Sequence, residues 1–271
     1  MTQAMTPPGL LAGRYHLERV LGTGGMGVVY RARDLLHEQF GEPCSHVALK
    51  VVGDGLAQSS DAHVLLYSEF AVTRRLHHER IVRVFTFDVD TTCEVAFFTM
   101  ELLSGVTLDR LLLENPGGVP WPQLQALAVQ VLDALAYAHG QGVLHGDLKP
   151  ANVMVGETGI HLFDFGLGQG EGLPQLSRSR FNAWTPAYAA PELADGGALT
   201  PAADLYGVAC MVYELAEGGR PDERQPVKPR RLPRQCWPAL KTALAGDPQR
   251  RVISVAELRE ALARDPRRWY L

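Results

Sequence analysis

The strongest chemical signal in the sequence lies near its middle. His-Gly-Asp-Leu-Lys-Pro-Ala-Asn occupies residues 145–152, and an Asp-Phe-Gly triplet begins at Asp164. The carboxylate of Asp147 can accept the proton of an attacking hydroxyl, and Lys149 can neutralise charge on a transferred phosphoryl group. Asn152 and Asp164 supply oxygen atoms that can hold a metal ion against the phosphates of ATP. Because each role needs that residue type, the pattern predicts magnesium-dependent phosphoryl transfer.

The size and charge of the chain fit a folded enzyme. Its 271 residues are 46% hydrophobic, which is enough to bury the core of one two-lobed domain or of two small ones. The formal net charge of -4 gives no overall attraction to nucleic acid or to an anionic membrane. We therefore expect no nucleic-acid partner.

The cysteines and the apolar stretches indicate which cellular compartment suits the chain. Cys44, Cys93, Cys210 and Cys236 lie far apart without a CxxC pair, which suits a reducing cytoplasm. The longest apolar stretch, residues 205–215, is too short to span a bilayer and predicts a buried helix. We expect no membrane segment in this chain, and a cytoplasmic protein or the cytosolic part of a longer one.

The first hundred residues predict a small antiparallel β lobe with one helix. Strands are predicted at 15–20, 27–33, 47–52, 81–87 and 95–100. Apolar residues at roughly helical spacing predict a helix over residues 60–76, between the third and fourth of these strands. Residues 101–105 then leave the sheet as a connector, which we interpret as a hinge.

Beyond the connector the hydrophobic pattern is helical. One buried helical face is predicted from Leu124, Leu127, Ala128, Val131, Leu132, Leu135 and Ala138. Residues 218–238 are rich in proline and arginine, which argues against a long helix there. The fold class predicted is α+β with two lobes. Its parts are a disordered lead-in at 1–13, a small lobe at 14–103, a large lobe at 104–265 and a tail at 266–271.

A glycine cluster follows the first predicted strand. Residues 22–30 read Gly-Thr-Gly-Gly-Met-Gly-Val-Val-Tyr. Backbone amides in such a segment can approach phosphates closely, because glycine carries no Cβ. A dinucleotide-binding fold would need a helix after the glycines, whereas a strand is predicted here. An ordinary glycine hairpin would also fit this segment taken alone.

From about Tyr15 to about Leu262 the sequence resembles the eukaryotic-like (Hanks-type) serine/threonine protein kinases of bacteria. Besides the motifs above, residues 185–192 read Thr-Pro-Ala-Tyr-Ala-Ala-Pro-Glu and are similar to the end of a kinase activation segment. The resemblance implies the bilobal kinase fold. It also implies transfer of the γ-phosphoryl group of ATP to Ser/Thr hydroxyls of the protein itself and of partner proteins. Mg²⁺ is the implied metal cofactor, with Mn²⁺ as a substitute.

The resemblance assigns roles to individual residues. Catalytic roles fall on Asp147, Lys149, Lys50 and Glu69, and metal ligation falls on Asn152 and Asp164. Nucleotide contacts fall on Gly22, Thr23, Gly24, Gly25, Met26, Gly27, Val28, Val29, Ala48, Lys50, Met100, Glu101 and Leu103. Glu69 lies nineteen residues after Lys50 and is expected to pair with it.

Structural contacts are implied as well. They join Glu192 to Arg251, Asp204 to the backbone of the catalytic loop, and Thr185 to Asp147 and Lys149. The family also places a substrate-docking helix within residues 218–238, and in this sequence that helix is expected to be shortened or lost.

One position departs from the usual family pattern. Most of these kinases carry arginine between the histidine and aspartate of the catalytic loop, and this chain has Gly146. That arginine binds a phosphorylated residue of the activation segment in a charge-assisted contact. We therefore predict that activity does not depend on phosphorylation of Ser177 or Ser179.

The sequence leaves two alternatives to a protein kinase open. A His-Gly-Asp loop followed by asparagine also resembles small-molecule phosphotransferases of the aminoglycoside and choline type. The Ala-Pro-Glu triplet at 190–192, Asp204 and the Val-Val-Tyr end of the glycine loop favour a protein kinase. A pseudokinase that binds nucleotide without transferring phosphate is the second alternative.

Overall fold

The computed structural model describes residues 9–24, 27–52, 62–165, 169–170, 185–222 and 225–264. The described chain divides into two compact units. The first comprises the described residues up to Arg75 together with Val82–Leu103, and the second comprises Leu76–Ile81 and the described residues from Ser104 onward. Residues 76–81 therefore belong to the second unit although both flanking segments belong to the first.

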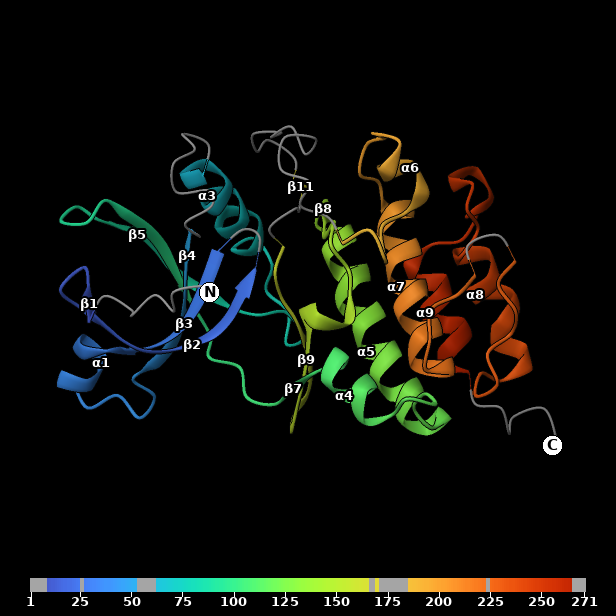
Figure 1. The fold of residues 1–271 in the computed structure, drawn as a ribbon, viewed down its shortest axis with the longest axis horizontal. Coiled ribbons are helices and arrows are strands. Elements are labelled where there is room, and N and C mark those ends of the chain that lie inside the picture. Colours follow the sequence, from blue (N-terminus) through green and yellow to red (C-terminus); the bar gives the residue numbers. More distant parts are fainter. Residues whose placement is uncertain are drawn as a thin grey trace, which may run out of the picture. The chain divides into compact units, whose positions relative to one another are not determined.

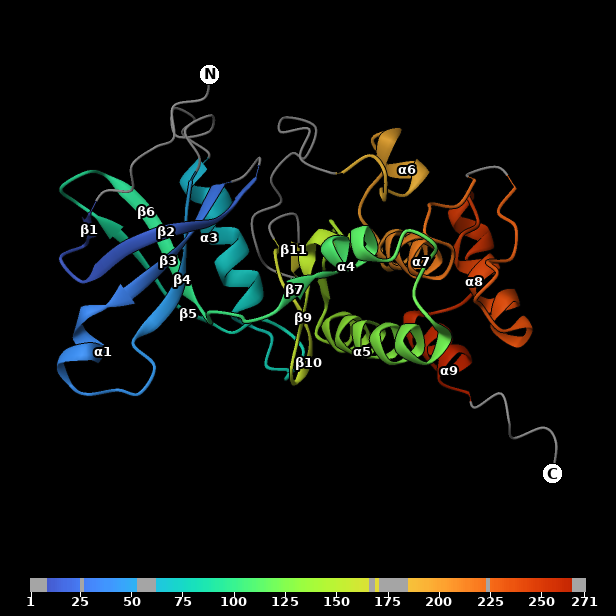
Figure 2. The same cartoon turned by 60° about the horizontal axis from the view of Figure 1, so that its bottom comes forward.

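The first unit is built on a six-stranded antiparallel sheet with the order β1-β2-β3-β4-β6-β5 (Figures 1 and 2). Its strands are β1 (Leu10–Leu11), β2 (Tyr15–Gly24), β3 (Gly27–Asp34), β4 (His46–Val52), β5 (Val84–Asp90) and β6 (Val95–Met100). The short β1 was not predicted. The strand expected from residue 81 begins at Val84, because Ile81 instead forms an isolated bridge with Leu162 of the second unit.

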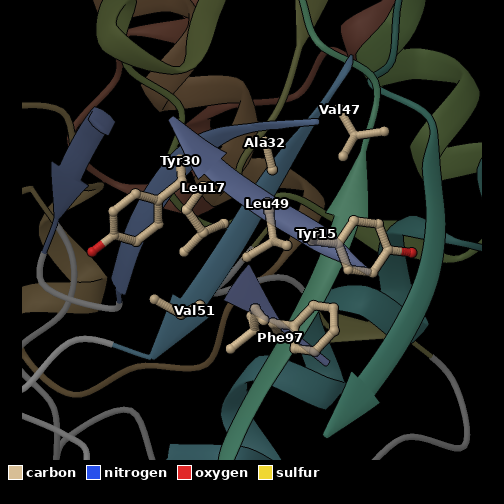
Figure 3. Packing of buried hydrophobic residues seen from close by; sticks show 9 residues of the cluster. Tyr15, Leu17, Tyr30, Ala32, Val47, Leu49, Val51 and Phe97 are labelled. Atoms are coloured by element: carbon tan, nitrogen blue, oxygen red, sulfur yellow. The ribbon is translucent and has the colours of Figure 1, made fainter. Parts of the chain in front are cut away.

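Alternating apolar residues of four strands form the core of this sheet. Figure 3 shows them lying together: Tyr15, Leu17, Tyr30, Ala32, Val47, Leu49, Val51 and Phe97. The rings of Tyr15 and Phe97 meet edge to face, with their centroids 5.5 Å apart. Because side chains alternate between the two faces of a strand, this packing fixes the register of the sheet.

Helices α1 and α3 lie in the described part of the same unit (Figures 1 and 2). The first, α1 (Leu35–Gln39), was not predicted; the side chain of Asp34 accepts hydrogen bonds from the first backbone N–H groups of this helix. The predicted helix at 60–76 is α3 (Ala62–Thr73). Phe70 of α3 packs against Phe98 of β6, with ring centroids 6.0 Å apart, which holds this helix to the sheet.

The second unit is mainly helical. Its helices are α4 (Leu108–Glu114), α5 (Trp121–Gly140), α6 (Pro191–Ala194), α7 (Pro201–Glu217), α8 (Trp237–Ala243) and α9 (Val255–Ala263). Its strands are β7 (Val106–Thr107), β8 (Val143–Leu144), β9 (Val153–Gly156), β10 (Gly159–Leu162) and β11 (Gln169–Gly170). Its 3₁₀ turns are η1 (Pro150–Asn152), η3 (Arg234–Cys236) and η4 (Pro248–Arg250).

Two of these helices confirm the predicted burial. All seven residues of the predicted helical face are buried in α5. The predicted buried helix is α7, which begins after the Thr200 N-cap and ends at Gly218, where φ is +85°. Glycine suits this left-handed position at a helix end, because a side chain there would be strained.

The chain between α7 and η3 forms no helix in its described part, residues 218–222 and 225–233. This confirms the expectation that proline and arginine exclude a long helix here. Among the described residues of the whole chain, none of the helices combines the length and apolar character needed to cross a bilayer.

Candidate active site

Lys50 and Glu69 form a buried ion pair inside the first unit. Lys50 lies on β4 and is paired on its two sides with Val29 of β3 and Phe98 of β6. Its Nζ donates to Glu69 Oε1 at 2.6 Å and to Oε2 at 2.7 Å. The two residues are only 6% and 5% exposed. A buried charge is costly unless it is paired, so each side chain fixes the position of the other.

The glycine segment forms the end of the β2–β3 hairpin. Gly22, Thr23 and Gly24 end β2, and their partners on β3 include Val28 and Val29. An added Cβ at Gly22 or Gly24 would meet no atom of the described chain within 4 Å, and neither residue has positive φ. Neither backbone conformation nor packing therefore requires glycine at these positions, and the surface they present is open to a ligand. The predicted contacts Gly25 and Met26 lie outside the described residues, whereas Gly27 begins β3.

Four further predicted nucleotide contacts lie within β4, at the end of β6 and just after β6. Ala48 is buried and pairs with the half-buried Met100. The backbone N–H of Glu101 donates to the carbonyl of Arg83 at 2.8 Å. In the described part of the chain, the Glu101 carbonyl and the Leu103 N–H take part in none of the backbone hydrogen bonds of turns and loops. These two groups are therefore available to a ligand.

The predicted catalytic loop begins after β8 with a buried histidine. His145 is 0% exposed, its ring centroid lies 4.5 Å from that of Phe165, and its Nε2 lies 3.2 Å from the carbonyl oxygen of Phe163. Its Nδ1 accepts the backbone N–H of Asp147 at 3.2 Å. Burial lowers the pKa of His145, so its neutral form, with the proton on Nε2, satisfies both contacts.

Asp147 is oriented by its neighbours. Lys149 Nζ donates to Asp147 Oδ2 at 2.5 Å and to Thr185 Oγ1 at 2.8 Å. The backbone N–H of Thr185 points to Asp147 Oδ1 at 3.3 Å. The side-chain amide of Asn152 donates to the backbone carbonyl of Asp147 at 2.8 Å. The structure thus brings together Asp147, Lys149 and Asn152 with Thr185, which comes from a distant segment of the same unit.

The two predicted metal ligands present oxygen atoms. Asn152 is 4% exposed, and with its amide nitrogen engaged by Asp147, its Oδ1 accepts no hydrogen bond from the described residues. Asp164 has φ of +66°, an unusual value for a residue other than glycine. Strained backbone of this kind is concentrated at functional sites, and the completely buried Phe165 anchors it here.

Asp204 holds the backbone of the catalytic loop. It is 2% exposed in the first turn of α7, and its carboxylate accepts the N–H groups of His145 and Gly146, both at 2.8 Å. A third contact, to His139 Nε2 at 2.9 Å, was not predicted. Burial raises the pKa of Asp204, but the hydrogen bonds that its carboxylate accepts, from His139 first and from the Gly146 backbone, help to outweigh it, and the pKa lies below its usual value.

Gly146 adopts a conformation that favours glycine. Its φ is +83°, in the left-handed region, which costs an L-residue with a side chain roughly 1–2 kcal/mol. The two N–H groups that Asp204 binds belong to Gly146 and its predecessor, so this turn is held in place by α7. Ser177 and Ser179 lie outside the described residues.

Glu192 and Arg251 form the predicted ion pair. Arg251 Nη1 and Nη2 bind the two Glu192 carboxylate oxygens at 2.6 and 2.8 Å. The same guanidinium donates to the carbonyls of Ala202, Ala245 and Gly246, and it lies 4.8 Å from the ring centroid of Tyr206. This pair joins the segment after Thr185 to the C-terminal part of the unit.

Another contact of this segment was missed by sequence reasoning. The hydroxyl of Tyr188 donates to Glu214 on α7. Burial raises the pKa of Tyr188, and the bond to the carboxylate adds to this shift. Tyr188 lines a crevice whose walls also include Asp147, Thr185 and Gly207. No local pattern signals the Tyr188 contact, because its partner is 26 residues away on another element.

Known proteins match both the sequence and the fold. A family model described as "protein kinase domain" matches residues 15–238. The serine/threonine-protein kinase PkaA of Streptomyces coelicolor is 36% identical over 263 residues, covering 89% of this chain and 48% of PkaA. The DNA damage-responsive serine/threonine-protein kinase RqkA of Deinococcus radiodurans is 37% identical over 254 residues, covering 89% of this chain and 36% of RqkA. The chain thus spans about half of one relative and about a third of the other.

A solved structure agrees with these sequence matches. The crystal structure of the PknI kinase domain of Mycobacterium tuberculosis has a TM-score of 0.72 to this chain at 28% identity, covering 95% of this chain and 98% of that one. The predicted α+β kinase fold with two compact units is confirmed. The chain therefore belongs to the protein kinase domain family, among the serine/threonine protein kinases of bacteria.

Proposed function

We propose that this protein transfers the γ-phosphoryl group of MgATP to Ser/Thr hydroxyls on itself and on partner proteins. The observation that carries the proposal is the arrangement around Asp147. Its carboxylate lies within hydrogen-bond distance of Lys149 Nζ and of the Thr185 N–H, and its backbone carbonyl is bound by Asn152. Phosphoryl transfer needs this combination of a base, a cation and an oxygen ligand in one place.

The donor set fits a hard divalent cation. Protein kinases in general use ATP with a divalent metal. Asn152 Oδ1 and the Asp164 carboxylate are both oxygen donors, the type that Mg²⁺ and Mn²⁺ prefer. The bond from the Asn152 amide to Asp147 leaves Oδ1 as the atom of that side chain that could bind a metal. When bound, the metal would neutralise charge on the phosphates of ATP.

The first unit would supply the nucleotide contacts. Gly22 and Gly24 leave their strand surface open, as close approach of a phosphate requires. Lys50 is held in place by Glu69, so its ammonium would meet the phosphates in a fixed position. Adenine would be bound by the available backbone groups of Glu101 and Leu103.

The second unit would act on the acceptor hydroxyl. Asp147 would accept the hydroxyl proton as the oxygen attacks phosphorus, and Lys149 would stabilise negative charge on the phosphoryl group in transfer. Because Thr185 and Asn152 orient Asp147 before substrate binds, the site needs little reorganisation during the reaction.

The test is transfer from labelled ATP with magnesium to the protein itself and to a generic basic protein, with mass-spectrometric mapping of the product. We expect label on Ser or Thr, and no label with Asp147→Asn. Nucleotide binding without any transfer would favour a pseudokinase. Transfer to an aminoglycoside or to choline, with no labelled protein, would favour a small-molecule phosphotransferase.

We further propose that activity does not require a phosphorylated activation segment. Gly146 offers no guanidinium to bind such a phosphate, and its backbone is held instead by the carboxylate of Asp204. The double variant Ser177→Ala/Ser179→Ala is therefore expected to keep kcat/KM within about twofold of the parent, because no phosphate on these serines is needed for activity. Steady-state kinetics on a fixed substrate measure this.

Thr185→Ala is the matched control for this variant, since Thr185 contacts both Lys149 and Asp147. We expect Thr185→Ala to lower kcat. If the double variant loses as much activity as Thr185→Ala while remaining folded, phosphorylation of the segment is required and the proposal fails.

A further inference from the structure

Residues 225–234 form a basic loop between α7 and α8. Their sequence, Gln-Pro-Val-Lys-Pro-Arg-Arg-Leu-Pro-Arg, has four cations and no acidic residue, in a chain whose formal net charge is -4. Figure 1 shows the chain between α7 and α8 in orange. The residues proposed to carry out phosphoryl transfer do not include this loop, so its charge needs a separate explanation.

The basic loop is held in one conformation although it contains no regular helix. Lys228 turns back, and its Nζ donates to the carbonyls of Pro229 at 2.6 Å and of Leu232 at 2.8 Å. Pro229 and Leu232 are both buried. Arg231 Nε donates to the carbonyl of Gly117, on the segment that precedes α5, at 2.8 Å. The loop is thus preorganised by contacts to its own backbone and to a distant segment.

The arginines of the loop face solvent. Arg230 binds Glu217 through its backbone N–H and its Nε, yet its side chain is 89% exposed. Arg231 is exposed and uses only Nε in its contact with Gly117. Arg234 is exposed and forms no ion pair or hydrogen bond with the described residues. Val227, at 70% exposure, adds an apolar group to the same loop.

Acidic groups of the chain neutralise this surface only in part. Glu217 pairs with Arg230, and Asp222 accepts the backbone N–H of Gln225 at the start of the loop. Among the described residues, Arg230 is the one arginine of the loop that forms an ion pair with a carboxylate of the chain. The planar guanidinium of arginine binds carboxylates in a bidentate way, and a preorganised backbone lowers the entropy lost on binding.

We propose that the basic loop docks an acidic, carboxylate-rich segment of a protein that this kinase phosphorylates. That the docked protein is a substrate rests on the proposed function. The docking contact itself does not depend on catalysis. Arg231 and Arg234 would supply the main contacts, because Arg230 is already paired. Docking would raise the local concentration of the substrate at the enzyme without taking part in the transfer step.

Docking is measured first without turnover. The probe is a fluorescent peptide of alternating glutamate and glycine, which has no Ser, Thr or Tyr and so cannot be phosphorylated. We expect saturable binding by fluorescence anisotropy that weakens as salt is added. Exposed ion pairs are individually weak, so Arg231→Gln/Arg234→Gln is expected to lower the affinity about 10-fold.

The matched control is Arg110→Gln/Arg250→Gln, which removes the same charge from two exposed arginines on α4 and η4 of the same unit. We expect it to bind the peptide like the parent. No saturable binding at low salt, or equal losses in the two double variants, would overturn the proposal. Tighter binding of a DNA duplex than of the peptide at equal charge would assign the loop to nucleic acid instead.

A second measurement links docking to phosphorylation. A serine-containing substrate peptide is compared with the same peptide extended by the glutamate-glycine sequence. The extension is expected to lower KM for the parent enzyme, to leave kcat unchanged, and to have no effect on the Arg231→Gln/Arg234→Gln variant. Turnover of both peptides with equal KM would refute docking while leaving the kinase activity established. Absence of any turnover would refute the proposed function, whereas the binding result would stand.

Discussion

Asp147→Asn is expected to lower kcat for phosphoryl transfer by about 10²- to 10⁴-fold, the usual contribution of a positioned general base. Asparagine keeps the shape of the side chain and can still accept the Thr185 N–H, but it cannot accept the proton of the attacking hydroxyl. The variant also removes the negative partner of Lys149, which lies 2.5 Å from Asp147 Oδ2. Steady-state rates at saturating ATP measure the loss.

The control for this experiment is Asp109→Asn, an exposed aspartate in the first turn of α4 in the same unit. The kcat of Asp109→Asn should equal that of the parent. Nucleotide affinity should change little in Asp147→Asn, because the proposed nucleotide contacts belong to other residues. An unchanged kcat in a folded Asp147→Asn protein would remove Asp147 from the catalytic role.

The second large effect concerns stability. Glu192→Ala is expected to lower the free energy of unfolding by about 3–5 kcal/mol, as when one partner of a buried ion pair is removed. The side chain of Arg251 is 0% exposed, and both of its terminal nitrogens bind Glu192. Without that carboxylate, the partners that the buried guanidinium keeps among the described residues are three backbone carbonyls and the ring of Tyr206.

Urea unfolding followed by tryptophan fluorescence measures this change, since Trp121 and Trp237 both lie on helices of the second unit. The matched control is Glu217→Ala on α7. Its partner Arg230 has a side chain that is 89% exposed, so the loss should stay below about 1 kcal/mol. Equal destabilisation by the two variants would show that burial of Arg251 does not set the strength of the Glu192 pair.

The meeting of the proposed catalytic residues was predictable because much of the site is local in sequence. Asp147, Lys149 and Asn152 lie within six residues, so a short turn brings them together whatever surrounds it. The spacing of Lys50 and Glu69 was also informative, because a strand followed by a helix packed on the same sheet brings the two together. The resemblance supplied the more distant pairs, Glu192 with Arg251 among them.

Other features were missed for two different reasons. The strand expected from residue 81 was wrong at its start, because Ile81 bonds to Leu162 rather than to the neighbouring strand, and a local pattern does not show such a distant contact. Helix α1 carried a local signal, the N-cap residue Asp34, but its five residues are too few to show a helical hydrophobic pattern.

The residue types proposed for the reaction, the five longer strands and helix α3 of the first unit, and the absence of a long helix in the described part of residues 218–238 could be predicted from the chain alone. Each depends on residue type or on short-range periodicity. Only the tertiary structure showed that the buried carboxylate of Asp204 also binds His139, which lies 65 residues earlier in the chain. It alone revealed the positive φ of Gly146 and Asp164. It also showed that Lys228 turns inward while the arginines of the basic loop face solvent. Such features depend on which distant groups come into contact when the core packs. A local sequence pattern does not show these contacts.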